Sequence, residues 1–175
     1  MTILNIVTAP DQILKEKSLS IKSVDDEVRK LMYDMLETMY HNNGVGLAAV
    51  QVGILKRVLI VDLQDSDDQE RENSFFPLFI ANPEIIEQSI ELVVATEGCL
   101  SLPEQSIEIA RPYSIKLRFL NYNNVLQEIV SDGWLARAIQ HEIDHLDGKL
   151  LIDYLSNIKR DIALRKLKKL KKHCL

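Results

Sequence analysis

The sequence predicts an α+β fold in which mixed, mainly antiparallel β-sheets pack around a central helix. Apolar residues at spacings of three and four over residues 24–40 are typical of an amphipathic helix, and the same spacing returns over 132–146. Between these segments, short runs rich in β-branched residues alternate with Pro, Gly and Asn, which favours strands joined by turns. With 175 residues and 46% hydrophobic composition, we expect one domain spanning 1–175.

The first expected elements are an N-terminal helix and a buried strand. We expect Ser23 to cap the helix over 24–40, because a serine hydroxyl can accept a backbone N–H of the first turn. A glycine-containing segment follows at 44–53. The apolar run within 57–63 predicts a strand, and the polar, acidic stretch 64–74 lacks periodicity, which indicates a surface loop.

The second half of the chain is expected to alternate strands with turns and to end in two helices. The strands are expected near residues 79–82, 85–94, 106–109, 115–120 and 125–131. Asp132 is the expected N-cap of a helix that runs to about Leu146, where Gly148 is a natural stop. A last helix is expected over 156–172.

Charge is distributed unevenly along the chain. The formal net charge is -5, yet residues 153–175 contain eight Lys and Arg against two Asp, so an acidic body carries a basic C-terminal helix. Such a helix is most often a solvated surface, although it can also bind a phosphate backbone. No apolar run approaches the roughly 18 residues of a membrane span, and no secretory signal is recognisable. With only two cysteines, Cys99 and Cys174, we expect a cytoplasmic protein without disulfides or membrane contact.

The most informative pattern is H-E-x-x-H, formed by His141, Glu142 and His145 within the second predicted helix. Residues four apart lie one helical turn apart, so both imidazoles can bind one metal ion while Glu142 reaches a water on that ion. Catalytic sites of this kind typically use three protein ligands, so one more is needed. A lone cysteine such as Cys99 is more often a small buried apolar residue, and the pattern alone leaves the third ligand open.

Three short motifs together resemble those of a known family. They are G-V-G-L-A-A-V-Q at residues 44–51, E-G-C-L-S at 97–101 and Q-H-E-I-D-H at 140–145. In order, content and spacing they are similar to the signature motifs of bacterial peptide deformylases. This family hydrolyses the formyl group from the N-terminal formyl-methionine of new proteins and releases formate. The resemblance covers nearly the whole chain and implies N-formyl-methionyl peptides and nascent chains as partners.

The resemblance implies a role for each matched residue at the metal. Cys99 would be the third ligand beside His141 and His145, and a bound water would lose a proton more easily near the cation. Glu142 would take that proton as general base and later deliver it to the leaving amine. A thiolate and two imidazoles suit zinc, iron, cobalt or nickel. The family implies Fe(II) in the cell, with Zn(II), Ni(II) or Co(II) possible in the isolated protein.

Other matched residues are expected to hold the substrate. The side-chain amide of Gln51 and the backbone N–H of Leu100 would stabilise the negative charge that develops on the formyl oxygen. The family binds its peptide as an added strand, and Gly46 would let the two backbones approach closely, unless this glycine only shapes a turn. The methionine pocket and adjoining contacts are expected from Val45, Gly98, Trp134 and Ala138.

The resemblance also bears on residues around these motifs. Glu97 and Arg111 are expected to form an ion pair that supports the cysteine segment, although a surface pair without consequence is the alternative. Many relatives have an arginine where this chain has Ser106, so the resemblance implies that a charged contact to the substrate backbone is absent, with an expected effect on peptide affinity rather than on the reaction. His41 and His173 lie outside the motifs and are expected at the surface. The basic C-terminal helix resembles one associated with ribosome docking in bacterial relatives, which predicts salt-sensitive binding.

Two other functions are compatible with part of the pattern. An HExxH-type metallopeptidase usually takes its third ligand from a downstream His or Glu, and only 30 residues follow His145. A non-catalytic zinc-binding module would close its site with a fourth protein ligand and would not require Glu142 or Gln51. The presence of both residues favours catalysis. We expect a monomer, because the sequence shows no large unexplained apolar patch.

Overall fold

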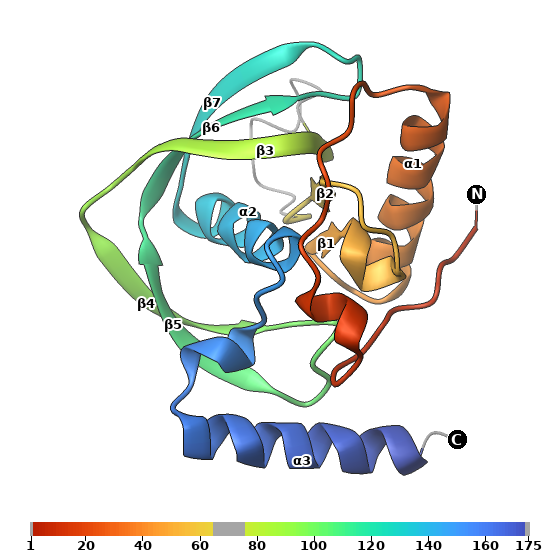
Figure 1. Cartoon of the computed structure of the whole chain (residues 1–175). Helices are drawn as coiled ribbons and strands as arrows, with labels where there is room; N and C mark the ends of the chain where they lie inside the picture. The colour runs from red at the N-terminus through yellow and green to blue at the C-terminus, as the bar shows by residue number, and fades with distance from the viewer. Residues whose placement is uncertain (1, 65–75, 174–175) are drawn as a thin grey trace.

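The computed structural model describes residues 2–64 and 76–173, and it arranges their strands in two antiparallel sheets (Figure 1). The strands are β1 (Gly46–Ala48), β2 (Val58–Val61), β3 (Leu78–Gln88), β4 (Leu92–Gly98), β5 (Ser106–Pro112), β6 (Ser114–Leu120) and β7 (Leu126–Asp132). A five-stranded sheet has the order β1-β2-β3-β6-β7, and β4 pairs with β5 in a separate two-stranded sheet. The pairings between these strands are antiparallel, and a parallel contact occurs as an isolated bridge between Leu19 and Lys56. The predicted α+β class is confirmed.

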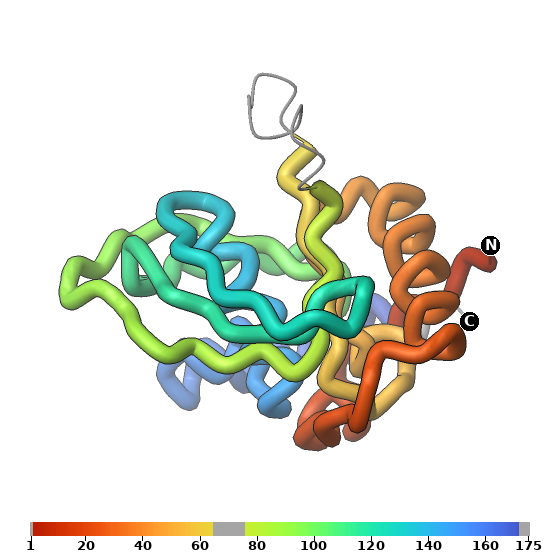
Figure 2. The backbone as a smooth tube through the Cα atoms, turned by 90° about the horizontal axis from the view of Figure 1, so that it is seen from above, coloured from red at the N-terminus to blue at the C-terminus, as the bar shows by residue number. Residues whose placement is uncertain are grey.

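Three α-helices and several short 3-10 helices complete the described chain. The elements are η1 (Gln12–Lys15), α1 (Asp26–His41), η2 (Ala49–Val52), α2 (Gly133–Leu146), η4 (Leu151–Tyr154) and α3 (Asn157–His173). Figure 1 shows α2 in the centre with strands around it, α1 beside β1 and β2, and α3 along the lower side. Seen from above in Figure 2, α3 lies on the far side of the strands from the viewer. Within the described ranges, no helix has both the length and the apolar character that crossing a membrane requires.

The central helix α2 is buried on more than one side, because elements of both sheets pack against it. Ala136, Ile139 and Leu146 are fully covered, as expected for the apolar face of an amphipathic helix. Polar residues of α2, among them His141 and Glu142, are buried as well. Buried polar groups need partners, so their gathering on one interior helix marks the place where a site is built.

The apolar interior is divided into three clusters around this helix. One lies between α2 and the five-stranded sheet and includes Ile139, and a second lies under α1 and includes Met35. The third joins β5, η4 and α3 through residues such as Leu167. The polar part of α2 therefore lies among separate apolar regions rather than at the edge of a single core.

The predicted cap of the first helix is wrong. Helix α1 begins at Asp26, and its N-cap is Asp25 rather than Ser23. The Asp25 carboxylate accepts the backbone N–H of Val28 at 2.9 Å. An aspartate is as good a cap as a serine, and its negative charge also favours the N-terminal end of the helix dipole.

The strands predicted over 79–82 and 85–94 are divided differently in the structure. Strand β3 runs through Pro83 to Gln88, and a new strand begins at Leu92. The register of β3 against β6 shifts between Ala81 and Glu84, which is a bulge. Because proline has no N–H to give to the ladder, the bulge lets β3 continue where the sequence suggests a break.

The other elements that the sequence predicted agree with the structure to within a few residues. Asp132 occupies the N-cap position of α2 as predicted, although its side chain makes no capping hydrogen bond. Gly148 follows the helix with a φ of +73°, and a Cβ there would lie 2.4 Å from the carbonyl oxygen of Lys15, so both the turn and the close approach require glycine. Of the predicted loop 64–74, Gln64 is described, and residues 65–74 lie outside the described part of the chain.

Candidate metal centre

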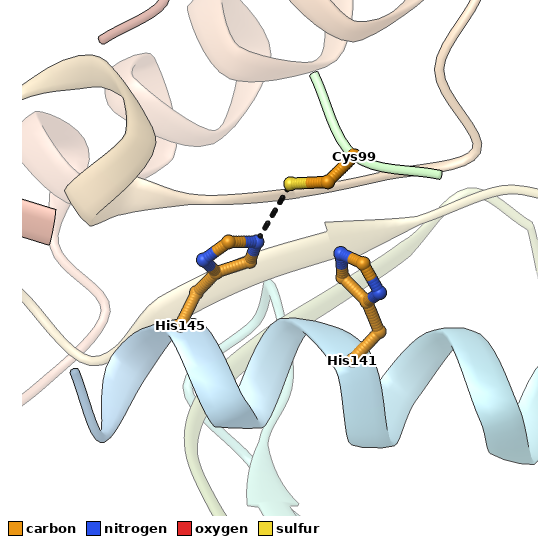
Figure 3. Close-up of side chains that lie close together, drawn as sticks. All are labelled: Cys99, His141 and His145. Atoms are coloured by element: carbon orange, nitrogen blue, oxygen red, sulfur yellow. Dashed lines mark hydrogen bonds between the residues drawn. The ribbon is translucent and has the colours of Figure 1, made fainter. Parts of the chain in front are cut away.

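Cys99, His141 and His145 bring three metal-ligating atoms together at the centre of the molecule. These atoms all lie within 4.8 Å of one another, and Cys99 Sγ is 3.1 Å from His145 Nε2. Figure 3 shows both imidazoles rising from the same side of α2 toward Cys99, which directly follows β4. Since metal–nitrogen and metal–sulfur bonds measure about 2.0–2.3 Å, one ion fits between the three atoms.

The surroundings of the two histidines suit a divalent metal. His141 Nδ1 lies 2.9 Å from a carboxylate oxygen of Glu97, which assigns the proton to Nδ1 and leaves Nε2 for a metal. Burial lowers the pKa of His145 well below its usual value, so its imidazole is neutral and able to ligate. Within the described residues the cluster has three members, which matches catalytic sites that keep a fourth position for water or substrate.

Glu97 is the centre of a buried charge network behind His141. Its two oxygens face Arg111 Nε and Nη2 at 2.7 and 2.9 Å, Arg137 Nη1 at 2.6 Å and His141 Nδ1 at 2.9 Å. Burial alone would raise the pKa of Glu97, but hydrogen bonds from His141 and Arg111 lower it to about 2. The predicted pair of Glu97 and Arg111 is confirmed, and it is an interior pair, because each side chain is 5% exposed.

Glu142 lies beside the cluster, and its carboxylate is buried. The residue is 4% exposed, and its Oε2 has no hydrogen-bond partner within the described part of the chain. Burial raises the pKa of Glu142 to about 7, against the lowering effect of the His141 and Arg111 charges. A carboxyl group with this pKa can both take up and release a proton near neutral pH.

Gly46 is in direct contact with this carboxylate. A Cβ built on Gly46 would lie 2.4 Å from Glu142 Oε1 and 3.0 Å from Glu142 Cδ, so no larger side chain fits while Glu142 keeps its place. Glycine at this position therefore allows the backbone of β1 to pass next to the Glu142 carboxylate.

The side chain of Gln51 is held with its amide nitrogen toward the metal cluster. Gln51 Oε1 accepts the backbone N–H of Ala48 at 2.8 Å, which fixes the orientation of the amide. Gln51 Nε2 then faces Ser101 Oγ at 3.2 Å and Cys99 Sγ at 3.6 Å. From this position the amide N–H of Gln51 can donate a hydrogen bond to an oxygen that gains negative charge beside the cluster.

A cavity of about 440 Å³ opens above these residues. Its volume lies in the range of pockets for small ligands. Every site residue predicted from the sequence except His145 lines it; they are Val45, Gly46, Gln51, Gly98, Cys99, Leu100, Trp134, Ala138, His141 and Glu142. His145 lies below, where it is 1% exposed. Ser106 also lines the cavity, so the position where many relatives have arginine belongs to the pocket wall.

A family model described as polypeptide deformylase matches residues 3–161 of the chain. The chain belongs to the peptide deformylase family. Peptide deformylase 1 of Rickettsia conorii is 63% identical over 171 residues, which cover 98% of each chain. The peptide deformylase of Orientia tsutsugamushi, strain Ikeda, is 51% identical over 175 residues, which cover 98% of this chain and 97% of that one.

Solved structures of this family agree with the fold. The crystal structure of peptide deformylase from Ehrlichia chaffeensis has a TM-score of 0.91 and 43% sequence identity, and the match covers 98% of both chains. The structure of the Ehrlichia chaffeensis enzyme in complex with actinonin has a TM-score of 0.89 and 44% identity, covering 97% of this chain and 98% of that one. The deformylase fold therefore extends over almost the whole chain.

Sequence reasoning missed two contributions to this deformylase site. It predicted that Glu97 pairs with Arg111, but it did not predict the contact between Glu97 and His141, because that contact joins β4 to α2 across 44 residues of sequence. It also passed over Arg137, which lines the cavity and bonds to Glu97. The available signal was an arginine four residues, about one turn, before His141 in the helix that was expected to hold the metal. His41 is exposed as predicted, and the side chain of His173 lies outside the description.

Proposed function

We propose that this peptide deformylase hydrolyses N-formyl-methionyl peptides with Glu142 as its acid–base group and Cys99, His141 and His145 as its metal ligands. The observation that carries the proposal is the position of Glu142, whose buried carboxylate lies at the cavity wall beside the three candidate ligands, with no hydrogen-bond partner for Oε2 among the described residues. A metallopeptidase with a downstream ligand is not favoured, because the third candidate ligand beside the two histidines is Cys99, which precedes the helix. A structural zinc module is not favoured either, since the cluster has three members within the described residues.

The chain's own groups can carry each proton and charge of the reaction. Cys99, His141 and His145 would hold a divalent ion, whose positive charge would make the water easier to deprotonate and would polarise the formyl carbonyl. Glu142 takes one proton from the attacking water and returns it to the amine nitrogen as the C–N bond of the formamide breaks. Gln51 Nε2 and the backbone N–H of Leu100 donate hydrogen bonds to the formyl oxygen while it carries negative charge. Formate and a free N-terminal methionine are the products.

The test is deformylation of formyl-Met-Ala-Ser by protein loaded anaerobically with Fe(II) or Ni(II). We expect stoichiometric release of formate and of the free tripeptide, with acetyl-Met-Ala-Ser as the control for an N-terminal acyl group of different size. Fully metallated protein that leaves the formyl peptide intact would contradict the proposed function.

We propose Fe(II) as the metal in the cell, which makes the enzyme sensitive to oxygen. The Cys99 ligand supports this, because it lines an open cavity where an oxidant can reach a ferrous thiolate centre. In air, the activity of the Fe(II) form is expected to decay much faster than that of the Ni(II) form of the same protein. Half-lives measured in parallel check this, and equal half-lives would remove the idea.

Gly46→Ala is expected to lower kcat by about 100-fold, since a misplacement of about 1 Å at a reacting group can cost this much. The new Cβ would force the Glu142 carboxylate out of position while leaving the metal ligands in place. Steady-state kinetics and metal analysis of the purified variant test both parts. A Cβ at Gly98 meets no atom within 4 Å, so Gly98→Ala should fold as stably as the parent and change mainly KM. A parental kcat in Gly46→Ala would contradict the assigned contact.

We also propose that α3 carries the enzyme to the ribosome. Ala163 and Leu167 pack against the body, whereas Ile158 and Ile162 are 76% and 46% exposed among the lysines and arginines of the helix. An exposed apolar strip with basic neighbours fits a surface of RNA and protein.

Charge reversal tests this docking better than truncation, because Leu167 is buried and its loss would disturb packing. Lys166→Glu with Lys169→Glu is expected to abolish co-sedimentation with ribosomes at low salt, since both lysines are exposed. Lys17→Glu with Lys22→Glu makes the same change of charge at exposed positions elsewhere and should sediment like the parent. Undiminished sedimentation of the α3 variant would count against docking.

A further inference from the structure

The three proposed metal ligands come from parts of the fold that belong to different hydrogen-bonded units. His141 and His145 are on α2, whereas Cys99 directly follows β4, which pairs with β5 in its own two-stranded sheet. Backbone pairing therefore does not fix the distance from Cys99 to the histidines. Side-chain contacts between α2 and the two-stranded sheet help to set it, beside the hydrogen bonds that Ala9 and Gln51 make to Ser101.

Arg137 makes such contacts to both strands. It lies on α2 one turn before His141, and its Nη1 donates to Glu97 Oε1 at 2.6 Å and to the carbonyl oxygen of Ile109 at 3.0 Å. Its Nη2 donates to the carbonyl oxygen of Val93. Val93 and Glu97 belong to β4 and Ile109 to β5, so one guanidinium fastens the helix to the whole width of this sheet.

The contact with Glu97 links Arg137 to two of the proposed ligands, His141 on α2 and Cys99 after β4. Glu97 Oε1 accepts from Arg137, and Glu97 Oε2 accepts from His141 Nδ1 at 2.9 Å. Glu97 is also two residues before Cys99 in the chain. Arg137 and His141, one turn apart on α2, thus bind the same carboxylate. Because Glu97 is close to Cys99 in the chain, these bonds restrict the position of the cysteine.

The guanidinium is enclosed, which strengthens its hydrogen bonds. The Arg137 side chain is 7% exposed, and Trp134 covers it with the ring centroid 5.8 Å from Arg137 Cζ. An arginine is suited to this position because its planar fork presents several donors at fixed angles, whereas a lysine ammonium cannot reach a carboxylate and two carbonyls with the same geometry.

We propose that Arg137 is a positioning residue of the metal centre, which holds the Cys99 segment at the distance from α2 that three-ligand binding requires. The inference rests on the proposed ligand set and does not depend on the deformylation step. Arg111 also reaches α2, through Asp144 at 2.8 Å, so a chain without the Arg137 side chain keeps a second tie between sheet and helix. We therefore expect its loss to displace the ligands without unfolding the protein.

The test measures metal retention in the Co(II)-loaded protein. Thiolate-to-cobalt absorption reports the bond to Cys99 directly, and its decay after addition of a chelator gives the rate of metal release. Arg137→Met is expected to release cobalt about 10- to 100-fold faster than the parent and to show a shifted or weakened absorption band, because outer partners of metal ligands have effects of this size. Arg118→Met is the matched control, since Arg118 is on β6 with its partners Glu128 and Glu84 and is 42% exposed.

Arg137→Lys separates charge from geometry. It retains the positive charge and the buried stem, and it should fall between Arg137→Met and the parent in both release rate and absorption. If Arg137→Met fails to fold, this variant decides the question. A folded Arg137→Lys or Arg137→Met with the parental release rate and the parental band would overturn the proposal. A parent that binds cobalt but does not deformylate would overturn the proposed function while leaving this inference standing.

Discussion

Glu142→Gln is expected to lower kcat for deformylation by about 1,000-fold while the protein keeps its metal ion. Glutamine has nearly the same shape as glutamate but cannot accept a proton, so the variant loses general acid–base catalysis, which typically contributes about 10²- to 10⁴-fold. The metal should remain, because the proposed ligands Cys99, His141 and His145 are unchanged. The measurement is the rate of formate release at saturating formyl-Met-Ala-Ser, with metal content determined on the same sample.

The control for this variant is Glu128→Gln, which makes the same change on β7, where Glu128 bonds with Arg118 instead of facing the cavity. It should retain parental kcat and KM. A fall of less than about tenfold in fully metallated Glu142→Gln would show that another group supplies the proton transfer. Buried Glu142 would then need a structural explanation.

Cys99→Ala is expected to abolish stable metal binding and, with it, deformylation. The substitution leaves two imidazoles from one helix as proposed ligands, and it removes the only sulfur among the three candidate ligating atoms. Loss of a direct ligand should exceed the about 10- to 100-fold change in affinity that loss of an outer partner causes. Metal titration of the apoprotein, followed by competition with a chelator, measures this change.

Cys174→Ala is the matched control, because Cys174 is the other cysteine of the chain. We expect it to bind metal and turn over like the parent. Stoichiometric, tightly held metal in Cys99→Ala would contradict the ligand set. The same result would weaken the reasoning about Arg137, which depends on Cys99 being a ligand.

Much of this site could be predicted from the sequence because helical periodicity is local. A spacing of four in an apolar helical pattern places His141 and His145 on one side of α2, and no tertiary information is needed for that conclusion. Cys99 required the family resemblance, since residues on different elements have no such fixed relation. The structure brings Cys99 Sγ within 3.1 Å of His145 Nε2.

The features that could not be predicted depend on contacts between distant segments. Arg137 reads as one more charged residue until β4 and β5 are packed on α2 and present their carbonyl groups to it. The path of β3 through Pro83 is decided by a bulge against β6, whereas the sequence shows only a residue that disfavours strands. The choice of Asp25 over Ser23 as a cap was local, but two good caps two residues apart cannot be ranked by residue type alone.

The buried polar side of α2 sets a limit on how stable this protein can become. Well-packed apolar residues often match or exceed buried ion pairs in stability, so a chain selected only for resistance to heat would replace Glu97 and Arg137 with aliphatic side chains. Such a chain would gain apolar contact where α2 meets β4 and β5. It would also lose the groups that orient His141, and the thermostable product would be an inactive one. Engineering for stability should therefore begin at the outer surface of the sheets and leave the interior helix untouched.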